Sequence, residues 1–503
     1  MKPFYLTTPL YYVNDVPHIG HAYTTIAADI LARWKRMNGE PVFFLTGTDE
    51  HGAKIAAAAE KTGESPQVFV DRIASEYRSV WKILNISYDD FIQTSQSRHK
   101  QVVQDVFEKL KSLGDIYKGT YEDWYCVHDE SYFSEGELVD KKCPSCGRDV
   151  QKLKEESYFF KLSKYAPALL AHYEKNPEFL SPKHRASEII NFVRGGLNDL
   201  SVSRTRVSWG IPITSDPSHT VYVWFDALLN YVSAPPKEDW PADIHLVGKE
   251  IFRFHTVIWP AMLMALGLPL PKRIFAHGWW TVEGTKMSKS LGNVVNPVQM
   301  AEEYGVDAFR YFLFREVPFG ADGDFSEKSL LARYNAELAN NLGNLLQRTL
   351  TLLTKNFDGV IPERKEQPVL LSDLPALSKT LRAQYDNLAF GDVLETLFGL
   401  MMRTNKYIDE QAPWKLGAEQ KERLAAVLLE CLSVIKALAV FLHPFMPLKT
   451  QDIWERIGEP GTLSEQAAPL LRSFAAGQLP AINPGQKILK GDPLFMRKGG
   501  RWK

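Results

Sequence analysis

The sequence predicts an α/β chain with a doubly wound parallel sheet, split by a connective insertion and followed by an all-α helical bundle. Strand and helix patterns alternate over residues 1–117 and again over 221–325, which is typical of parallel sheets covered by helices. The alternation breaks over residues 118–220, and almost every pattern from 326 to 475 is helical. We therefore expect four segments with these bounds and a tail over 476–503.

Length and composition restrict the class of protein. The chain has 503 residues, too many for a single core, and 45% hydrophobic and 24% charged residues are ordinary for a globular protein. A net charge of -1 excludes a globally basic nucleic-acid binder, so any RNA contact must be local. Only four cysteines occur and the N-terminus has no signal-peptide pattern, so we expect a cytoplasmic protein. The apolar run Leu424–Leu442 carries Glu430 and Lys436, which favours a buried helix over a membrane span.

Two histidines stand at the first turn of the chain. Phe4–Thr7 is predicted to be a buried strand, and apolar residues recur at helical spacing from Thr24. Between them lies Pro-His-Ile-Gly-His, with His18, Gly20 and His21 at a strand-to-helix turn, where backbone N–H groups attract anions. The imidazoles could donate to a phosphate on either side of a glycine that has no Cβ. The pattern alone also fits two histidines that cap a helix.

The second predicted strand, Pro41–Thr46, leads to a polar loop that contains Asp49. Helices are expected at Ala53–Lys61, Pro66–Leu84 and Ser97–Leu113. In a doubly wound sheet ligands bind outside the carboxyl ends of the strands, where both the His18 turn and the Asp49 loop would lie. Asp49 could equally cap a helix.

The insertion contains a candidate metal knuckle. Cys143-Pro-Ser-Cys146-Gly has the spacing that folds backbone amides over two thiolates, and Cys126 supplies a third. The fourth ligand could only be Asp129 or His128. Zinc and a metal-free loop with free thiols both remain open.

The second half of the sheet is rich in aromatic residues. Val221–Tyr231 is expected to be an aromatic strand that runs into a helix, and Ile244–Lys249 a strand and turn. Phe252–Leu266 is a predicted helix whose His255 and Trp259, four residues apart, share a face. Core packing is the ordinary reason for such aromatics. The last strand, Arg273–Val282, precedes Lys286-Met-Ser-Lys289-Ser, a sequence that fits either a mobile polyphosphate clamp or a solvated loop.

As a pair, His-Ile-Gly-His and Lys-Met-Ser-Lys-Ser resemble the class I aminoacyl-tRNA synthetases, and the segments between them resemble the methionyl-tRNA synthetase family along nearly the whole chain. The resemblance implies ATP as a substrate with Mg²⁺. It assigns catalysis to His18, His21, Lys286 and Lys289. It assigns ATP binding to these four residues and to Gly20, Gly248 and Gly278.

The same resemblance assigns the methionine-binding residues. They are Leu10, Tyr12, Asp49, Trp224, Ala227, Tyr231, His255 and Trp259. A carboxylate at Asp49 suits an ammonium group, and aromatic edges suit a polarisable thioether. In this family some members hold zinc in the knuckle through a thiolate or imidazole at the fourth position, and others have lost it.

The helical region carries the positions that the resemblance implies for the anticodon, namely Asn344, Arg348 and Trp414. Stacking on aromatic side chains is how unpaired RNA bases are commonly read. A tryptophan that plugs the end of a bundle is the alternative for Trp414.

We therefore predict a monomeric enzyme that activates L-methionine with ATP and transfers it to the 3′ end of tRNA(Met), the initiator tRNA included. The rivals are another class I synthetase and a small-molecule nucleotidyltransferase with the same histidine turn. A non-catalytic tRNA-binding relative is the third alternative. The insertion is too small for the editing domain that branched-chain synthetases need, and the helical third has no purpose in a bare nucleotidyltransferase.

Overall fold

The computed structural model describes residues 2–13, 16–127, 131–133, 135–144, 146–282, 284–286, 294–365 and 369–499. The chain divides into two compact units, each described here by itself. The first unit consists of Met1–Pro17, Phe43–Val80 and Tyr88–His277, and the second of His18–Val42, Trp81–Ser87 and Gly278–Lys503. These units are discontinuous in sequence, and the predicted division into five consecutive segments stays a prediction.

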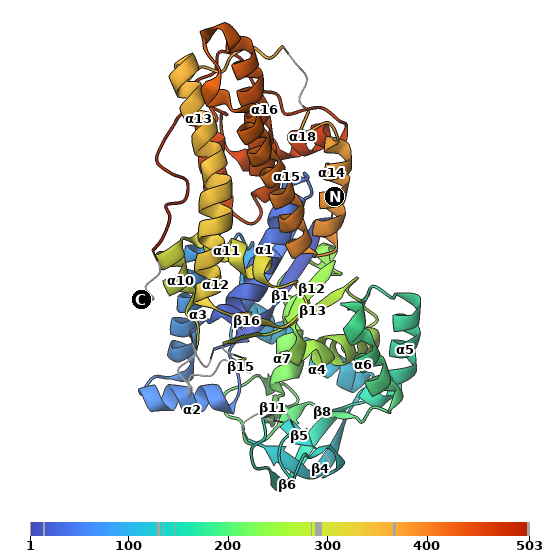
Figure 1. Ribbon diagram of the computed structural model, residues 1–503. Helices are drawn as coiled ribbons and strands as arrows, with labels where there is room; N and C mark the ends of the chain where they lie inside the picture. The colour runs from blue at the N-terminus through green and yellow to red at the C-terminus, as the bar shows by residue number, and fades with distance from the viewer. Residues whose placement is uncertain are drawn as a thin grey trace. The chain divides into compact units, whose positions relative to one another are not determined.

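A six-stranded sheet forms the centre of the first unit (Figure 1). Its order is β3 (Asp90–Gln93), β2 (Val42–Asp49), β1 (Phe4–Tyr12), β12 (Ile244–Gly248), β13 (Ile274–His277) and β7 (Leu180–Ser181). The pairs β2·β3, β1·β12, β12·β13 and β13·β7 are parallel. All five residues of β12 are buried, as expected for a central strand with both faces covered. The predicted doubly wound parallel sheet is confirmed.

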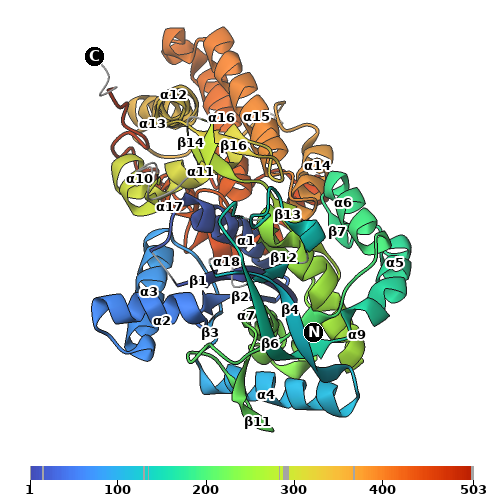
Figure 2. The ribbon, with the colours of Figure 1, turned by 90° about the horizontal axis from the view of Figure 1, so that it is seen from below.

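Helices and two small sheets complete the first unit. The helices are α2 (Ala53–Thr62), α3 (Pro66–Ile83), α4 (Ser97–Ser112), α5 (Ala166–Lys175), α6 (Lys183–Arg194), α7 (Val223–Leu228), α8 (Asn230–Ser233) and α9 (Trp259–Leu266). One small sheet has the order β5 (Ser131–Phe133), β4 (Ile116–Cys126), β6 (Gln151–Phe160) and β8 (Leu200–Ser201), and the other β10 (Pro212–Ile213), β11 (Asp216–Val221) and β9 (Ser203–Arg204). Figure 2 shows α5 and α6 beside the β7 edge of the central sheet.

The second unit is mostly helical. It holds α1 (Ile19–Met37), α10 (Pro297–Tyr304), α11 (Val306–Glu316), α12 (Glu327–Arg333), α13 (Asn344–Phe357), α14 (Leu374–Asp386), α15 (Phe390–Gln411), α16 (Lys421–Leu442), α17 (Pro447–Arg456) and α18 (Leu463–Ala475). A π-helical segment, Tyr334–Gly343, joins α12 to α13. Figure 1 shows α13, α15 and α16 side by side, which confirms the predicted bundle. A small sheet has the order β15 (Thr285–Lys286), β14 (Trp280–Val282) and β16 (Gly323–Phe325).

Among the residues that the structure describes, one helix is long and apolar enough to cross a membrane. The segment Ala418–Leu442 has a mean hydropathy of 2.2 over its most apolar stretch, and 94% of that stretch is buried. Lys436 and Glu430 on α16 are buried and bonded, Lys436 to Glu459 Oε1 and Glu430 to the backbone N–H groups of Val369 and Leu370. The predicted buried helix is confirmed.

Some local expectations are wrong. Trp224 lies on α7 and not on a strand, since β11 ends at Val221. The predicted helix around His255 contains a π-helical stretch, Phe254–Ile258. The sequence over Asp307–Phe314 predicts an amphipathic helix, but every one of these residues of α11 is buried.

Candidate functional site

His18 and His21 cap helix α1 with their own rings. The Gly20 N–H donates to His18 Nδ1 over 3.0 Å, and the His18 N–H donates to His21 Nδ1 over 3.2 Å. Each Nδ1 is therefore an acceptor, so in the neutral rings the proton lies on Nε2. Burial, followed by the neighbouring His18, lowers the pKa of His21 well below its ordinary value. Two N–H donors thus accompany a helix N-terminus, the arrangement that suits a phosphate.

The two rings also determine the residue between them. They stack with centroids 3.8 Å apart, and a Cβ on Gly20 would lie 2.9 Å from His18 Cε1. A side chain at position 20 would displace the ring that caps the helix. Gly20 is therefore required by His18 itself, a reason that the sequence did not reveal.

Gly248 and Gly278 are also explained by neighbours on the chain. A Cβ on Gly278 would lie 2.2 Å from the backbone oxygen of Ala321, and a Cβ on Gly248 would lie 2.5 Å from Glu250 Oε2. Both glycines allow a second segment to approach closely. Their predicted part in ATP binding is untested by this geometry and stays a prediction.

The loop with the two predicted lysines begins at a well-anchored hairpin. Thr281 on β14 pairs with Lys286 on β15, and Asp324 Oδ1 accepts from Thr281 Oγ1 at 2.7 Å and from the Gly284 N–H at 2.9 Å. Lys289 lies outside the described residues, and only the backbone of Lys286 is described. The anchor places the start of the loop without defining the lysine side chains.

In the first unit, hydrogen bonds hold the end of β2 and the residues that follow it. The Asp49 carbonyl accepts from the Val13 N–H at 3.2 Å, and Trp209 donates its Nε1–H to the Glu50 carbonyl. The Trp209 carbonyl in turn accepts from the Gly52 N–H at 2.9 Å. A segment of the insertion thus holds the residues directly after Asp49, the predicted ammonium-binding carboxylate at the end of β2.

A buried carboxylate joins this loop to helix α7. Asp226 Oδ2 lies 2.6 Å from His51 Nδ1, and Asp226 Oδ1 lies 2.6 Å from His99 Nε2. Burial alone would raise the pKa of Asp226, but His51 and His99 outweigh it and lower that pKa. An ionised carboxylate only accepts hydrogen bonds, so both rings donate to it. Asp226 sits between Trp224 and Ala227 in the sequence and so couples the Asp49 loop to α7.

The structure brings four of the predicted aromatic residues together. The His255 ring lies 6.4 Å from Trp224 and 5.7 Å from Tyr231, and the Tyr231 ring lies 5.7 Å from Trp259. Tyr231, His255 and Trp259 are almost fully buried, and Trp224 also stacks on Phe254 at 3.9 Å. Ala227 is buried on the same helix as Trp224, and Leu10 packs against this core. Tyr12 ends β1, with Lys54 Nζ 5.9 Å from its ring centroid.

Hydrogen bonds define which ring nitrogen of His255 carries a proton. Its Nδ1 lies 2.9 Å from the Ile251 carbonyl, which can only accept, so the proton lies on Nδ1. Burial lowers the pKa of His255 to about 4, so the ring is neutral near pH 7. Its Nε2 therefore accepts from the Tyr231 hydroxyl at 2.7 Å.

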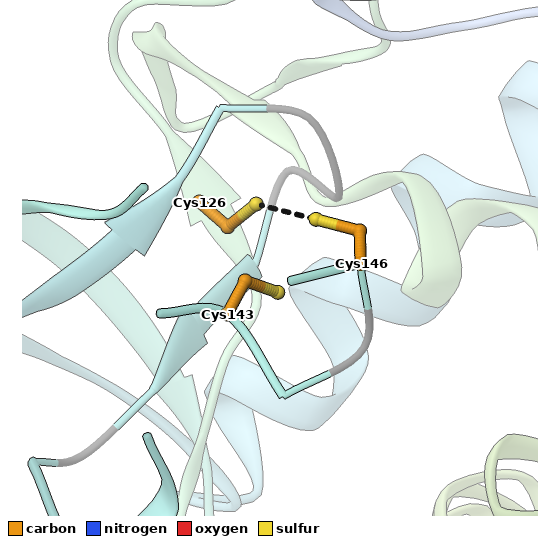
Figure 3. Close-up of side chains that lie close together, drawn as sticks. All are labelled: Cys126, Cys143 and Cys146. Atoms are coloured by element: carbon orange, nitrogen blue, oxygen red, sulfur yellow. Dashed lines mark hydrogen bonds between the residues drawn. The ribbon is translucent and has the colours of Figure 1, made fainter. Parts of the chain in front are cut away.

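Three cysteine sulfurs gather at one end of the β4 sheet (Figure 3). The Sγ atoms of Cys126, Cys143 and Cys146 all lie within 4.8 Å of one another, with 3.5 Å between Cys126 and Cys146. The Gly147 N–H donates to the Cys143 carbonyl at 2.8 Å, which closes the predicted knuckle. Asp129 and His128 lie outside the described residues. Three thiolates this close form a donor set that suits a soft or borderline divalent ion.

The predicted RNA-binding positions lie on the bundle. Trp414 belongs to a short 3-10 turn, Pro413–Lys415, after α15, and 50% of it is exposed. The Arg348 guanidinium lies 5.0 Å from the centroid of that indole and donates to Asp409 Oδ1 at 2.6 Å. Asn344, one turn earlier on α13, is exposed. Trp414 is therefore not a core plug.

Sequence reasoning missed the residues that hold the others in place. They are Glu50, His51, His99, Trp209, Asp226 and His245. Each is bonded to a residue far away in the sequence, so no local pattern indicates the pairing. The available signal is a polar residue within an apolar run, such as Asp226 in Val-Trp-Phe-Asp-Ala.

Comparisons with known proteins agree on one family. A family model described as tRNA synthetases class I (M) matches residues 4–155 and 136–350, and one described as the anticodon-binding domain of tRNA ligase matches 368–483. A methionine–tRNA ligase of Caldanaerobacter subterraneus is 48% identical over 511 residues, which cover 99% of this chain and 79% of that protein. That of Bacillus subtilis is 46% identical over 523 residues, covering 98% of this chain and 78% of the relative.

A solved structure is similar along the full length. The structure of Mycobacterium tuberculosis methionyl-tRNA synthetase in complex with methionyl-adenylate has a TM-score of 0.92 and 41% identity. It covers 99% of this chain and 100% of the solved chain.

Proposed function

The chain belongs to the class I tRNA synthetases of the methionine type, and we propose that it activates L-methionine with ATP and transfers it to tRNA(Met), the initiator included. In the first step a methionine carboxylate oxygen attacks the α-phosphorus of ATP, and the bond to the bridging oxygen breaks. The products are methionyl-adenylate and pyrophosphate. In the second step a ribose hydroxyl at the 3′ end of tRNA attacks the acyl carbon, and AMP leaves.

The observation that carries this proposal is the capping arrangement of His18 and His21. Both rings accept through Nδ1 and so hold their protons at Nε2. Two neutral donors and the N-terminal dipole of α1 favour an anion without a counter-charge that must be removed afterwards. We assign the phosphates of ATP to these two donors, with Mg²⁺ bound to the nucleotide.

The remaining roles follow from chemistry at each place. The substrate supplies its own nucleophile, so the protein needs no acylated or phosphorylated residue, and its contribution is positioning and charge stabilisation. We assign the ammonium group to the Asp49 carboxylate and the thioether to Trp224, Tyr231, His255 and Trp259. We assign the leaving pyrophosphate to Lys286 and Lys289.

We further propose that the cysteine cluster holds one Zn²⁺ through Cys126, Cys143 and Cys146, with Asp129 or His128 as the fourth ligand. Sulfur atoms at Zn–S bonds of about 2.3 Å in a tetrahedron lie about 3.8 Å apart, close to the 3.5 Å between Cys126 and Cys146. The ion would tie the loop with Cys143 and Cys146 to the end of β4. It takes no part in the reaction.

We also propose that Asn344, Arg348 and Trp414 contact the anticodon and that the enzyme acts as a cytoplasmic monomer. The exposed indole beside a guanidinium supports the first proposal. Light scattering after size-exclusion chromatography tests the second.

The main test is ATP–pyrophosphate exchange with each of the twenty amino acids in turn. We expect exchange with methionine and a rate at least tenfold lower with leucine, because pocket differences of this kind are worth about 10–200-fold. Equal exchange with leucine, or exchange that no amino acid stimulates, would contradict the proposal.

The lysine loop has a separate test. Lys289→Ala should lower the rate of exchange by about 2–4 kcal/mol of transition-state stabilisation, with little change in the KM for methionine. Lys328→Ala on α12, an exposed lysine outside the loop, is the control. A raised KM for methionine at unchanged kcat would contradict the role in pyrophosphate release.

A further inference from the structure

His245 is a fully buried histidine that packs against the aromatic cluster. It is the second residue of β12, where it pairs with Thr7 of β1 on one side and Ile274 of β13 on the other. The rest of the strand is apolar: Ile244, Leu246, Val247 and Gly248. A polar ring in such a place is costly unless both nitrogens are bonded.

Both nitrogens of His245 are bonded, and the partners define the tautomer. Trp259 donates its Nε1–H to His245 Nε2 at 3.3 Å, and Thr7 Oγ1 lies 2.8 Å from His245 Nδ1. An indole N–H can only donate, so Nε2 holds a lone pair and Nδ1 carries the proton that goes to Thr7. Burial, followed by His255, lowers the pKa of His245 well below its ordinary value and keeps the ring neutral.

The bonds continue to the other side of the aromatic cluster. Burial raises the pKa of the Tyr231 phenol, and Thr7 is among the side chains that interact with that hydroxyl. Thr7 Oγ1 accepts a hydrogen bond from His245 Nδ1, so its own O–H can donate to the Tyr231 oxygen. Tyr231 donates to His255, which donates to the Ile251 carbonyl. The donors therefore run in one direction, from Trp259 to Ile251.

Packing links the same residues. The His245 ring lies 4.2 Å from the Tyr231 ring at an interplanar angle of 31°. Tyr231 in turn lies 5.7 Å from Trp259. One imidazole thus supports the face of Tyr231 and holds the edge of Trp259.

We propose that His245, with Thr7, is a positioning pair that fixes Trp259 and Tyr231, and that this pair sets the preference for a thioether over a hydrocarbon side chain of the same length. The inference rests on the proposed function, because it takes methionine as the substrate. Sulfur gains from contact with aromatic edges only at a suitable distance and angle. Replacing sulfur by a methylene changes the substrate side chain only slightly. Discrimination between the two is therefore lost readily when the aromatic rings can tilt.

Two substitutions of His245 distinguish its bond to Thr7 from its bond to Trp259. His245→Asn retains a donor near the position of Nδ1 and loses the acceptor for Trp259, whereas His245→Gln can still reach Trp259. The control is His219→Asn on β11, another buried histidine of the same unit, which bonds Ser203 Oγ at 3.0 Å outside the aromatic cluster.

The assays are ATP–pyrophosphate exchange with methionine and norleucine, calorimetric binding of methionine alone, and the melting temperature. We expect His245→Asn to weaken methionine binding about tenfold, the effect of roughly one lost hydrogen bond. The ratio of kcat/KM for methionine to that for norleucine should fall at least about threefold, while kcat for methionine stays within about twofold. His245→Gln keeps the bond to Trp259 and loses the one to Thr7, so it should recover part of both losses, and His219→Asn should change neither.

An unchanged methionine-to-norleucine ratio in a folded His245→Asn variant would overturn the inference, as would an equal loss in His219→Asn. If His245→Asn does not fold, Thr7→Val decides: it removes the hydroxyl that accepts from His245 and donates to Tyr231, and we expect the ratio to fall, whereas an unchanged ratio overturns the inference. Failure of the proposed function looks different, because the wild-type chain would then show no methionine-dependent exchange.

Discussion

Removal of the Trp414 side chain tests the RNA end of the molecule most directly. Trp414→Ala should weaken tRNA charging while amino-acid activation continues. The indole is half exposed and follows Pro413, which is buried and anchors the turn. The anchor remains in the variant, so the turn should keep its place.

The structure gives the size of the effect. One base stacked on an aromatic ring is worth about 1–3 kcal/mol, or about 5–150-fold in binding. The Arg348 guanidinium lies 5.0 Å from the ring, and an exposed cation–π contact is worth only about 0.5–1 kcal/mol. The loss of folding stability should therefore be smaller than the loss of RNA affinity.

Three measurements on the one variant check this reasoning. We expect a higher KM for tRNA in aminoacylation, an unchanged rate of ATP–pyrophosphate exchange, and a melting temperature within a few degrees of the wild type. Met402→Ala, another exposed side chain of the second unit, is the control and should change none of the three. Parallel loss of both activities with earlier melting would refute the argument, and so would unchanged charging.

Three further predictions concern buried charge and the thiols. Burial raises the pKa of Asp307 from 3.8 to about 6, although the hydrogen bond from the Lys449 N–H acts in the opposite direction. Among the described residues, Asp307 Oδ1 has no hydrogen-bond partner. The folded state therefore holds this proton more tightly than the unfolded state, so the stability of the fold falls as pH rises from about 4 to about 6. In urea unfolding, Asp307→Asn should be more stable than the wild type by roughly 1–3 kcal/mol above pH 7 and equally stable below pH 4. Asp226 has a lowered pKa and accepts hydrogen bonds from two histidines. It therefore stabilises the fold above about pH 4, and this stabilisation is lost as pH falls below that value. Asp226→Asn should lower the free energy of unfolding by about 1.5–3 kcal/mol at pH 7. Cys146→Ser should lower the zinc content measured by elemental analysis from about one equivalent to below a tenth, since a structural site needs four ligands.

Each of these has a clear contrary result. A pH–stability curve of Asp307→Asn that parallels the wild type would mean that the carboxyl is not desolvated. Equal stability of Asp226→Asn and wild type at pH 7 would mean that the two histidines find other acceptors. Wild-type protein purified without chelator that contains less than a tenth of an equivalent of zinc would indicate free thiols instead of a metal site.

Strands β1, β2, β12 and β13 of the central sheet and helices α2, α3 and α4 could be predicted from the sequence because their patterns are local, whereas β3, β7 and the strands and helices of the insertion were not predicted. Helices α2, α3 and α4 begin as predicted and end within about one residue of the expected ends, since apolar spacing determines them. The His18 cap of α1 was one of the alternatives that the histidine turn left open. Helix α11 was misjudged because Arg310 is buried. Its guanidinium donates to Asp29 Oδ2 at 2.6 Å and to the backbone oxygens of Leu84, Pro444 and Phe445. No pattern within α11 reveals those partners.

The residues of the candidate site also fall into those that a local pattern predicts and those that it does not. His18, Gly20 and His21 could be found because three adjacent residues build the cap, and Cys143 and Cys146 because a short turn holds them. The pairing of His51 with Asp226 spans 175 residues and that of Thr7 with His245 spans 238. Spacing along the chain carries no information over such separations.

One signal for these distant pairs is nevertheless present in the sequence. A charged or polar residue within a run that is otherwise apolar must find a partner, because a buried polar group without one costs about 1–3 kcal/mol. His245 within Ile-His-Leu-Val-Gly and Asp226 within Val-Trp-Phe-Asp-Ala both meet that condition. The sequence could therefore have indicated both positions, and only the fold could supply Thr7, Trp259, His51 and His99 as their partners. Trp259 is itself a predicted methionine-binding residue, and Asp226 lies next to Ala227 on α7, so the residues that interrupt these two apolar runs help to hold the predicted site in shape.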